Sequence, residues 1–287
     1  MAEATRAVPP AVEGASGGEP SGDSDSGAAL PEPRWRAVDP ALAAAQQQAE
    51  PVPLRCWLAL PEQRPVRGGV LVLPEVFGVN AWVRSVAERL AAEGYAALAV
   101  PLFARTAPDL ELGYDDACLA LGRSHKERTS AGALLCDVAR AGSWLAKQMG
   151  DPEAPLGCIG FCFGGHVAML AASLQGMAAS IDCYGAGVGS GRPGGGPPTL
   201  ELLPQIPGRL LCFCGDRDPL LPEAEVQTIE AALACGPDPD RHRLIRMAGA
   251  GHGYLCEARA DHHPEAAART WPLVLAFLAE SLPQRCG

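Results

Sequence analysis

Short apolar runs alternate with longer amphipathic segments along the chain from residue 54 onward. Runs of this length are typical of strands buried on both faces, whereas apolar residues at helical spacing predict the crossover helices between them. Strands are expected at 69–73, 96–100, 156–159, 179–184, 210–213 and 243–246. Helices are expected at 82–93, 126–149, 163–174, 223–234 and 264–281. The alternation predicts an α/β fold with a mostly parallel central sheet and helices on both faces.

The first fifty residues have a different pattern. They consist largely of Ala, Pro, Gly, Ser and Glu, with few branched or aromatic side chains. Such a segment buries too little apolar surface to offset the entropy that is lost on ordering. We therefore expect a disordered tail at 1–50 and one domain at 51–287, which is long enough for a single large core.

Composition narrows the classes of function. The formal net charge is −10 and aromatic residues make up 5% of the chain, so we expect neither nucleic-acid binding nor attraction to an anionic membrane. No apolar run is long enough to span a bilayer, and the acidic residues near the N-terminus do not fit a leader peptide. The 11 cysteines lack the spacing of a disulfide framework. These features predict a cytoplasmic monomer with reduced thiols.

A glycine-flanked cysteine follows the apolar run at 156–159. The segment Gly-Phe-Cys-Phe-Gly at 160–164 leads from this strand into a helix, which is the nucleophile-elbow pattern with cysteine in place of serine. The turn strains its central residue, and Gly160 and Gly164 leave room for the neighbouring strand and helix. Cys162 then lies at a helix N-terminus, where the helix dipole favours a thiolate. The alternative for Cys162 is a structural cysteine in a glycine-rich turn.

Two backbone amides are candidates for an oxyanion hole. The N–H of Phe163, directly after the cysteine, is expected to point at the oxyanion of a tetrahedral intermediate. A second donor is expected from the loop at 74–78, from the N–H of Val76. Together they predict acyl transfer at Cys162.

The remaining catalytic groups are expected after later strands, in the order acid and then base. Asp216 and Asp218 both follow the strand at 210–213, and His252 lies in a Gly-flanked loop after the last strand. His252 would accept the thiol proton, and a carboxylate on its other nitrogen would fix the tautomer. By position either aspartate could serve, and the other would cap the turn.

Four ordered segments resemble the motifs of the dienelactone hydrolase family, the carboxymethylenebutenolidases. They are PEVFGVN at 74–80, GFCFGG at 160–165, GDRDPLLP at 215–222 and AGHGY at 250–254. The resemblance covers the chain from about residue 54 and implies an α/β-hydrolase fold that hydrolyses a small-molecule ester or lactone, with no cofactor and no metal. It further implies that Cys162 is the nucleophile, His252 the base and Asp218 the acid. Glu75 matches a family glutamate that contacts the cysteine, and a carboxylate there would keep the resting thiol neutral.

The chain departs from the family at the arginines that hold a substrate carboxylate. The position four residues after the histidine is Cys256, and the second arginine position falls on Ala120. Losing this clamp removes positioning of an anionic substrate, so a preference for neutral substrates is expected. Arg123 and Arg259 could reach the pocket from nearby.

Two further residues match the family pattern. Arg105 matches a family arginine outside the clamp and Tyr184 matches a Tyr-Gly element, so both are expected to contribute to substrate binding. The predicted activity is hydrolysis through a Cys-His-Asp triad and a thioester acyl-enzyme. One alternative is an inactive α/β-hydrolase-fold protein that serves as a binding or scaffold module, and another is a redox-active thiol protein. Activation of the thiol by His252 separates the enzyme from both.

Overall fold

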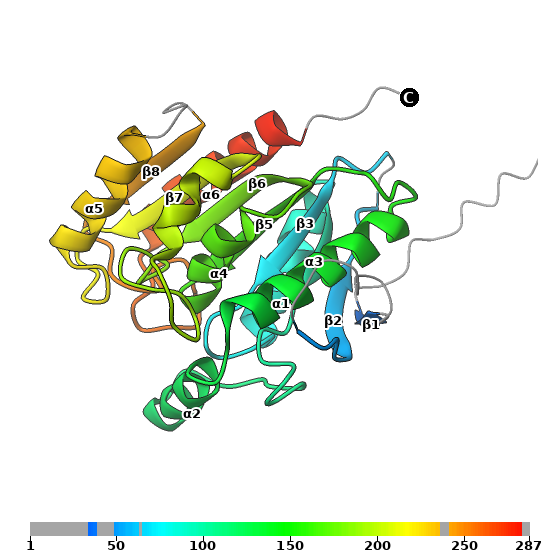
Figure 1. Cartoon of the computed structure of the whole chain (residues 1–287), viewed down its shortest axis with the longest axis horizontal. Coiled ribbons are helices and arrows are strands. Elements are labelled where there is room, and N and C mark those ends of the chain that lie inside the picture. Colours follow the sequence, from blue (N-terminus) through cyan, green and yellow to red (C-terminus); the bar gives the residue numbers. More distant parts are fainter. Residues whose placement is uncertain (1–33, 39–48, 63–64, 236–240, 283–287) are drawn as a thin grey trace, which may run out of the picture.

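The computed structural model describes residues 34–38, 49–62, 65–235 and 241–282, and every structural statement below concerns these residues. Their strands form one eight-stranded sheet in the order β1-β2-β4-β3-β5-β6-β7-β8 (Figure 1). β1 pairs antiparallel with β2, and β2 pairs antiparallel with β4. All other neighbouring strands, from β4 to β8, are parallel. The strands are β1 (Arg34–Val38), β2 (Leu54–Ala59), β3 (Gly69–Leu73), β4 (Ala96–Ala99), β5 (Leu156–Phe161), β6 (Met177–Cys183), β7 (Arg209–Gly215) and β8 (His242–Met247).

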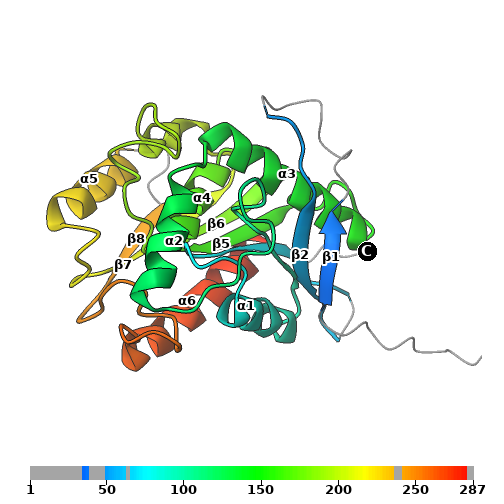
Figure 2. The same ribbon diagram turned by 90° about the horizontal axis from the view of Figure 1, so that it is seen from below.

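Helices cover both faces of this sheet, which gives the predicted α/β layer structure. Figure 2 shows α1 and α6 on one side and α3 and α4 on the other. Every residue of the central strands β3, β4 and β5 is buried, as expected for strands enclosed between two helical layers. The helices are α1 (Ala81–Ala92), α2 (Asp116–Lys126), α3 (Ala131–Gln148), α4 (Phe163–Ala171), α5 (Glu223–Ala234) and α6 (Pro264–Ser281), and a 3-10 helix spans Thr199–Gln205.

The predicted helix at 126–149 was wrong at its start. The chain instead forms two helices, because Glu127 ends α2 and Ser130 begins α3 by accepting a hydrogen bond from the Ala133 amide at 3.4 Å. Helix α2 itself was missed. It stands apart from the sheet (Figure 1) and buries only Gly122 and His125, so it lacks the broad buried apolar face by which the other helices pack on the sheet.

The N-terminal region differs from the prediction in two strands. Strand β2, at residues 54–59, was not among the expected strands, and neither was β1. Residues 34–38, which lie inside the predicted disordered tail, form β1 and pair antiparallel with β2. The unpaired backbone groups of an edge strand are a ready partner for such a segment, whatever its composition. The rest of the predicted tail, apart from residues 49 and 50, lies outside the described residues.

The parallel strands end at one edge of the sheet, where the loops after β3, β5, β6, β7 and β8 meet. Ligands of open α/β sheets bind at this carboxyl edge. Each sequence-predicted catalytic residue lies in one of these loops or directly after a strand. Among the described residues, no helix is long and apolar enough to cross a membrane.

Candidate active site

The turn between β5 and α4 holds Cys162 in a strained backbone conformation. Its φ is 54° and its ψ is −116°, and its amide donates a hydrogen bond to the Cys183 carbonyl oxygen at 3.0 Å. A Cβ at residue 160 would collide with the Gly164 carbonyl, and one at residue 164 would collide with the Leu73 carbonyl. The predicted elbow geometry is therefore confirmed, and the half-buried Cys162 lies at the N-cap of α4.

A cavity of about 420 Å³ opens above the elbow. Cys162 and His252 both line it, together with the two residues whose amides were predicted to form the oxyanion hole, Val76 and Phe163. Phe163 is the first residue of α4, and the first amides of a helix have no acceptor within it. The lining also includes three residues of α2 and two residues at or near the start of α5, which are Leu119, Arg123, Lys126, Gly187 and Glu225.

Helix α2 forms the roof of this cavity, and it rests directly on the loop after β3. A Cβ at Gly122 would collide with the carbonyl oxygen of Val76, so only glycine allows this approach. The roof helix and the loop that carries the Val76 amide are thus packed backbone against backbone.

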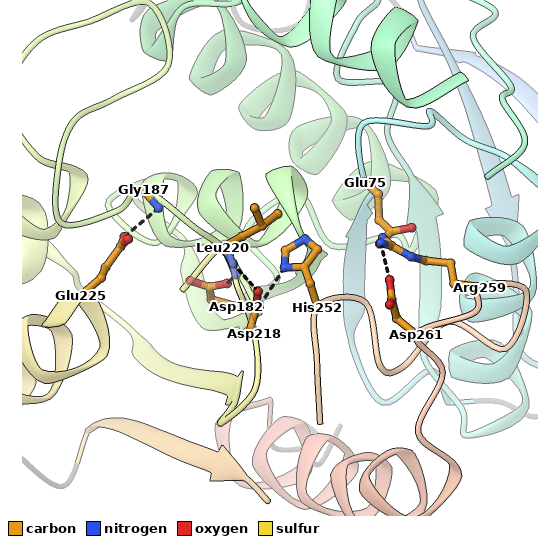
Figure 3. A network of polar contacts seen from close by, with 10 residues as sticks. Glu75, Asp182, Gly187, Asp218, Leu220, Glu225, His252, Arg259 and Asp261 are labelled. Atoms are coloured by element: carbon orange, nitrogen blue, oxygen red, sulfur yellow. Dashed lines mark hydrogen bonds and ion pairs between the residues drawn. The ribbon is translucent and has the colours of Figure 1, made fainter. Parts of the chain in front are cut away.

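His252 and Asp218 form a buried pair beside the cavity (Figure 3). The Nδ1 atom of His252 lies 2.8 Å from Asp218 Oδ2, and the other carboxylate oxygen of Asp218 accepts a hydrogen bond from the Leu220 amide at 2.8 Å. Asp216, the other candidate acid, accepts a hydrogen bond from the Gly249 amide at 2.7 Å. The structure thus brings Asp218, rather than Asp216, to the imidazole.

The charge on His252 is set by opposing influences. Burial, the largest, lowers the pKa of His252, but the charge of Cys162 and the hydrogen bond and charge of Asp218 outweigh it, and the pKa rises to about 10. The Nε2 atom is buried, and a hydrogen bond with the Cys162 side chain is a further cause of the raised pKa of His252. Since Nδ1 is held by Asp218, Nε2 is the nitrogen left to exchange a proton in the cavity.

Glu75 is buried in an ion pair with Arg259, and no hydrogen bond joins it to Cys162 in the described part of the chain, so the expected contact that would keep the resting thiol neutral is not made. The Arg259 Nη1 atom is 2.8 Å from Glu75 Oε1, whereas Glu75 Oε2 is buried without a hydrogen-bond partner among the described residues. Burial raises the pKa of Glu75, and Arg259 opposes this shift. Arg259 also pairs with Asp261 at 3.0 Å and lines the cavity, as does Arg123. The structure therefore places both expected substitute arginines at the pocket.

Neither of the two residues predicted to bind substrate lines this cavity, and their part in substrate binding stays a prediction. Arg105 is held by Asp137 at 3.0 and 3.1 Å and by the Glu50 carbonyl oxygen at 2.8 Å, and it lines a different, much smaller cavity. Tyr184 is fully buried and packs edge-on against His252, with ring centroids 5.3 Å apart. Tyr184 thus packs against the imidazole and is not part of the cavity lining.

One buried carboxyl group near the site was missed in the sequence. Asp182, at the end of β6, accepts a hydrogen bond from the Gly185 amide at 2.7 Å and lies beside the His252–Asp218 pair (Figure 3). Burial raises the pKa of Asp182 to about 8. A lone charged residue in an otherwise uncharged, buried strand was the signal that could have revealed it.

Cys158, His166 and Asp182 do not form a second triad, because their side chains have other hydrogen-bond partners. The Cys158 thiol contacts Ser180, and His166 contacts the Ala186 carbonyl at 2.9 Å and the Thr199 hydroxyl at 2.8 Å. Burial lowers the pKa of His166 to about 4, which suits a neutral side chain that ties a loop to α4. Within the described part of the chain, no group of three or more His, Cys, Asp or Glu residues could hold a metal ion.

This arrangement defines a class of protein. A nucleophile elbow after a central parallel strand, with an aspartate and a histidine after later strands, is the architecture of the α/β-hydrolases. A family model described as the dienelactone hydrolase family matches residues 54–282. The chain belongs to this family and is a hydrolase of esters or lactones.

Individual relatives agree with this assignment. A Synechocystis protein named "Putative carboxymethylenebutenolidase" is 38% identical over 205 residues, which are 71% of this chain and 82% of the relative. A Rhodococcus opacus "Carboxymethylenebutenolidase" is 29% identical over 218 residues, covering 74% and 81% of the two chains. A Klebsiella pneumoniae crystal structure titled "Putative Dienelactone Hydrolase" has a TM-score of 0.72 at 25% identity and covers 87% of this chain and all of that one.

Proposed function

We propose that this protein hydrolyses a small ester or lactone through a Cys162–His252–Asp218 triad and a thioester acyl-enzyme. The observation that carries the proposal is that Cys162, on a strained elbow, and His252, oriented by a buried aspartate, line one cavity. A binding or scaffold module needs only the cavity. It has no need of a strained cysteine or of an imidazole held by a buried carboxylate.

The first half of the reaction forms the thioester. His252, whose raised pKa favours the imidazolium, holds the proton of the Cys162 thiol, and the thiolate sulfur attacks the acyl carbon. The amides of Phe163 and Val76 stabilise the resulting oxyanion. The bond to the leaving oxygen then breaks, and the Nε2 proton of His252 passes to that oxygen as the alcohol departs.

The second half releases the acid. Neutral His252 takes a proton from water, and the hydroxide attacks the thioester carbon. The carbon–sulfur bond breaks, the acid leaves, and the thiolate–imidazolium pair is restored. Asp218 stays ionised throughout and stabilises the imidazolium.

The cavity supports a revised proposal for substrate charge. Arg259 lies three residues beyond the position that aligns with the family arginine, yet it lines the cavity, and Arg123 does so from α2. The expected preference for neutral substrates is therefore replaced by a broader proposal, in which the substrate is either a neutral or a carboxylate-bearing ester or lactone.

Turnover of a panel of activated esters and unsaturated lactones tests the proposal. We expect Cys162→Ala and His252→Ala to abolish turnover, while Cys235→Ala, which removes an exposed thiol on α5's C-cap, leaves it unchanged. Mass spectrometry should detect the acyl group on Cys162 during turnover. Equal activity in native protein and Cys162→Ala would exclude the triad. A monomeric state, a cytoplasmic location and the absence of nucleic-acid partners stay predictions.

A further inference from the structure

An acidic side chain forms part of the cavity wall and takes no part in the proposed chemistry. Glu225, in the first turn of α5, lines the cavity, and its Oε1 atom accepts a hydrogen bond from the Gly187 amide at 2.7 Å. Figure 3 shows Glu225 and Gly187 on one side of His252, and Glu75 and Arg259 on the other. The cavity therefore has an acidic end on the far side of the imidazole from Arg259.

The charge of Glu225 is not paired within the described part of the chain. Two other acids of the same helix, Glu223 and Glu230, share Arg246 at 2.7 Å each, whereas Glu225 has no ion pair with any described residue. The charge of Glu225 also contributes to the raised pKa of Asp182. With Oε1 occupied by Gly187, Oε2 is an acceptor that no described side chain or amide fills. A carboxylate can only accept hydrogen bonds, so its natural partner is a donor on the substrate.

The other charges of the cavity decide which donor fits. Arg123 and Lys126 line the same cavity from α2, and Lys126 lies 5.9 Å from the centroid of the Phe163 ring. These cations and an imidazolium at His252 repel an ammonium group, while Glu225 repels a second carboxylate. A hydroxyl group donates to Glu225 without either penalty.

We propose that Glu225 is a specificity residue that selects esters or lactones bearing a hydroxyl group on the part that extends from the reacting carbonyl toward Gly187. This rests on the proposed function, because the reacting carbonyl must lie at Cys162. The competing explanation is that Glu225 only fastens the loop at Gly187 to α5.

The variant Glu225→Gln separates the two explanations. The glutamine amide oxygen can still accept from the Gly187 amide, so the loop stays fastened. Its NH₂ group then occupies the second position, where it can donate only a neutral hydrogen bond to the substrate hydroxyl oxygen, in place of the charge-assisted bond that the carboxylate accepts from the hydroxyl proton. The matched control is Glu223→Gln on the same helix, whose side chain points to Arg246 and not into the cavity.

The experiment compares paired esters that differ only by a terminal hydroxyl or a terminal methyl group. One pair carries the difference on the acyl part and a second pair carries it on the alcohol part. In one of the two pairs, native protein and Glu223→Gln should show a kcat/KM higher for the hydroxyl ester by about fivefold to tenfold, the effect of a hydrogen bond to a partly exposed charge. In Glu225→Gln the ratio should fall to about twofold to threefold, because a neutral hydrogen bond is roughly half as strong as a charge-assisted one, with turnover of the methyl ester retained.

Two outcomes overturn the inference. One is a ratio near one for both pairs in native protein, and the other is an unchanged hydroxyl preference in Glu225→Gln. Failure of the proposed function is a different result, since native protein would then turn over no ester of either pair faster than Cys162→Ala does.

Discussion

The buried ion pair between Glu75 and Arg259 makes a testable contribution to stability. The side chain of Glu75 is 1% exposed and that of Arg259 is 15% exposed. Replacing the arginine, as in Arg259→Met, leaves a carboxyl group in the interior without its cation. Such a group either stays ionised at a cost of several kcal/mol or takes up a proton.

The size of the loss follows from the second route. A carboxyl group with an ordinary pKa of 4.5 that is forced to stay neutral costs about 1.4 kcal/mol for each pH unit above that value. Burial already raises the pKa of Glu75 in the native protein, and Arg259 is partly exposed. The expected loss in free energy of unfolding at pH 7.5 is therefore smaller than this full cost, about 3 kcal/mol. At pH 5 the loss should be under about 1 kcal/mol. Stability of the variant therefore falls, relative to native protein, as the pH rises.

Urea unfolding at pH 5 and pH 7.5 measures both values. The double variant Glu75→Gln/Arg259→Met should recover most of the loss at pH 7.5, because no charge is then left buried. Arg89→Met serves as the control, since Arg89 and Glu257 form a pair whose side chains are 42% and 44% exposed, and its smaller effect should not depend on pH in this range. Equal losses at the two pH values, or a double variant weaker than Arg259→Met, would refute the reasoning.

Three further predictions concern the carboxyl groups and glycines beneath the site. Because its pKa is raised, the buried Asp182 opposes folding increasingly as the pH rises from about 4 to about 8. The stability of Asp182→Asn relative to native protein, measured by urea unfolding, should therefore rise by roughly 2–4 kcal/mol between pH 5 and pH 8. An opposite trend would show that the carboxyl group is ionised in the fold. Asp218→Asn should slow alkylation of Cys162 by iodoacetamide at pH 7 at least tenfold, measured by mass spectrometry at that residue, and an unchanged rate would exclude the imidazole pair as the source of the thiolate. Gly165→Ala places a Cβ against Asp182 and should cost about 3 kcal/mol. Gly132→Ala, in a helix with open space around it, should stabilise by about 0.5–1 kcal/mol, and similar thermal unfolding of the two variants would contradict the packing argument.

Local patterns in the sequence were sufficient for most of the fold. The expected strand at 69–73 and the helices at 223–234 and 264–281 have the bounds seen in the structure, because a short apolar run or a proline-started amphipathic segment is defined within a few residues. The elbow was predictable for the same reason. Its two glycines and its cysteine lie within five consecutive residues, and the strain at Cys162 follows from their order.

Features that depend on distant partners were not predictable. β1 forms because the edge of β2 accepts it, and its residues in isolation have the composition of the tail around them. The position of Arg259 at the cavity depends on its ion pair with Glu75, 184 residues earlier in the chain. Arg105 was assigned to the substrate by family likeness, yet the buried Asp137 holds its guanidinium away from the cavity. Tyr184 was expected at the pocket, and its contact is with the His252 ring, to which the chain brings it from 68 residues earlier.

Because Gly122 packs closely on the Val76 carbonyl, we expect the size of a substrate to affect the rate at which it reacts. A bulky acyl group that displaces α2 should also move the backbone that carries the Val76 amide, the second oxyanion donor that we propose. On that mechanism such a substrate should lose stabilisation of its transition state even when it binds well, so we expect oversized substrates to be rejected at the chemical step, through kcat, as well as at the entrance to the cavity. Gly122 should thereby make turnover sensitive to the size of substrate groups that never contact it.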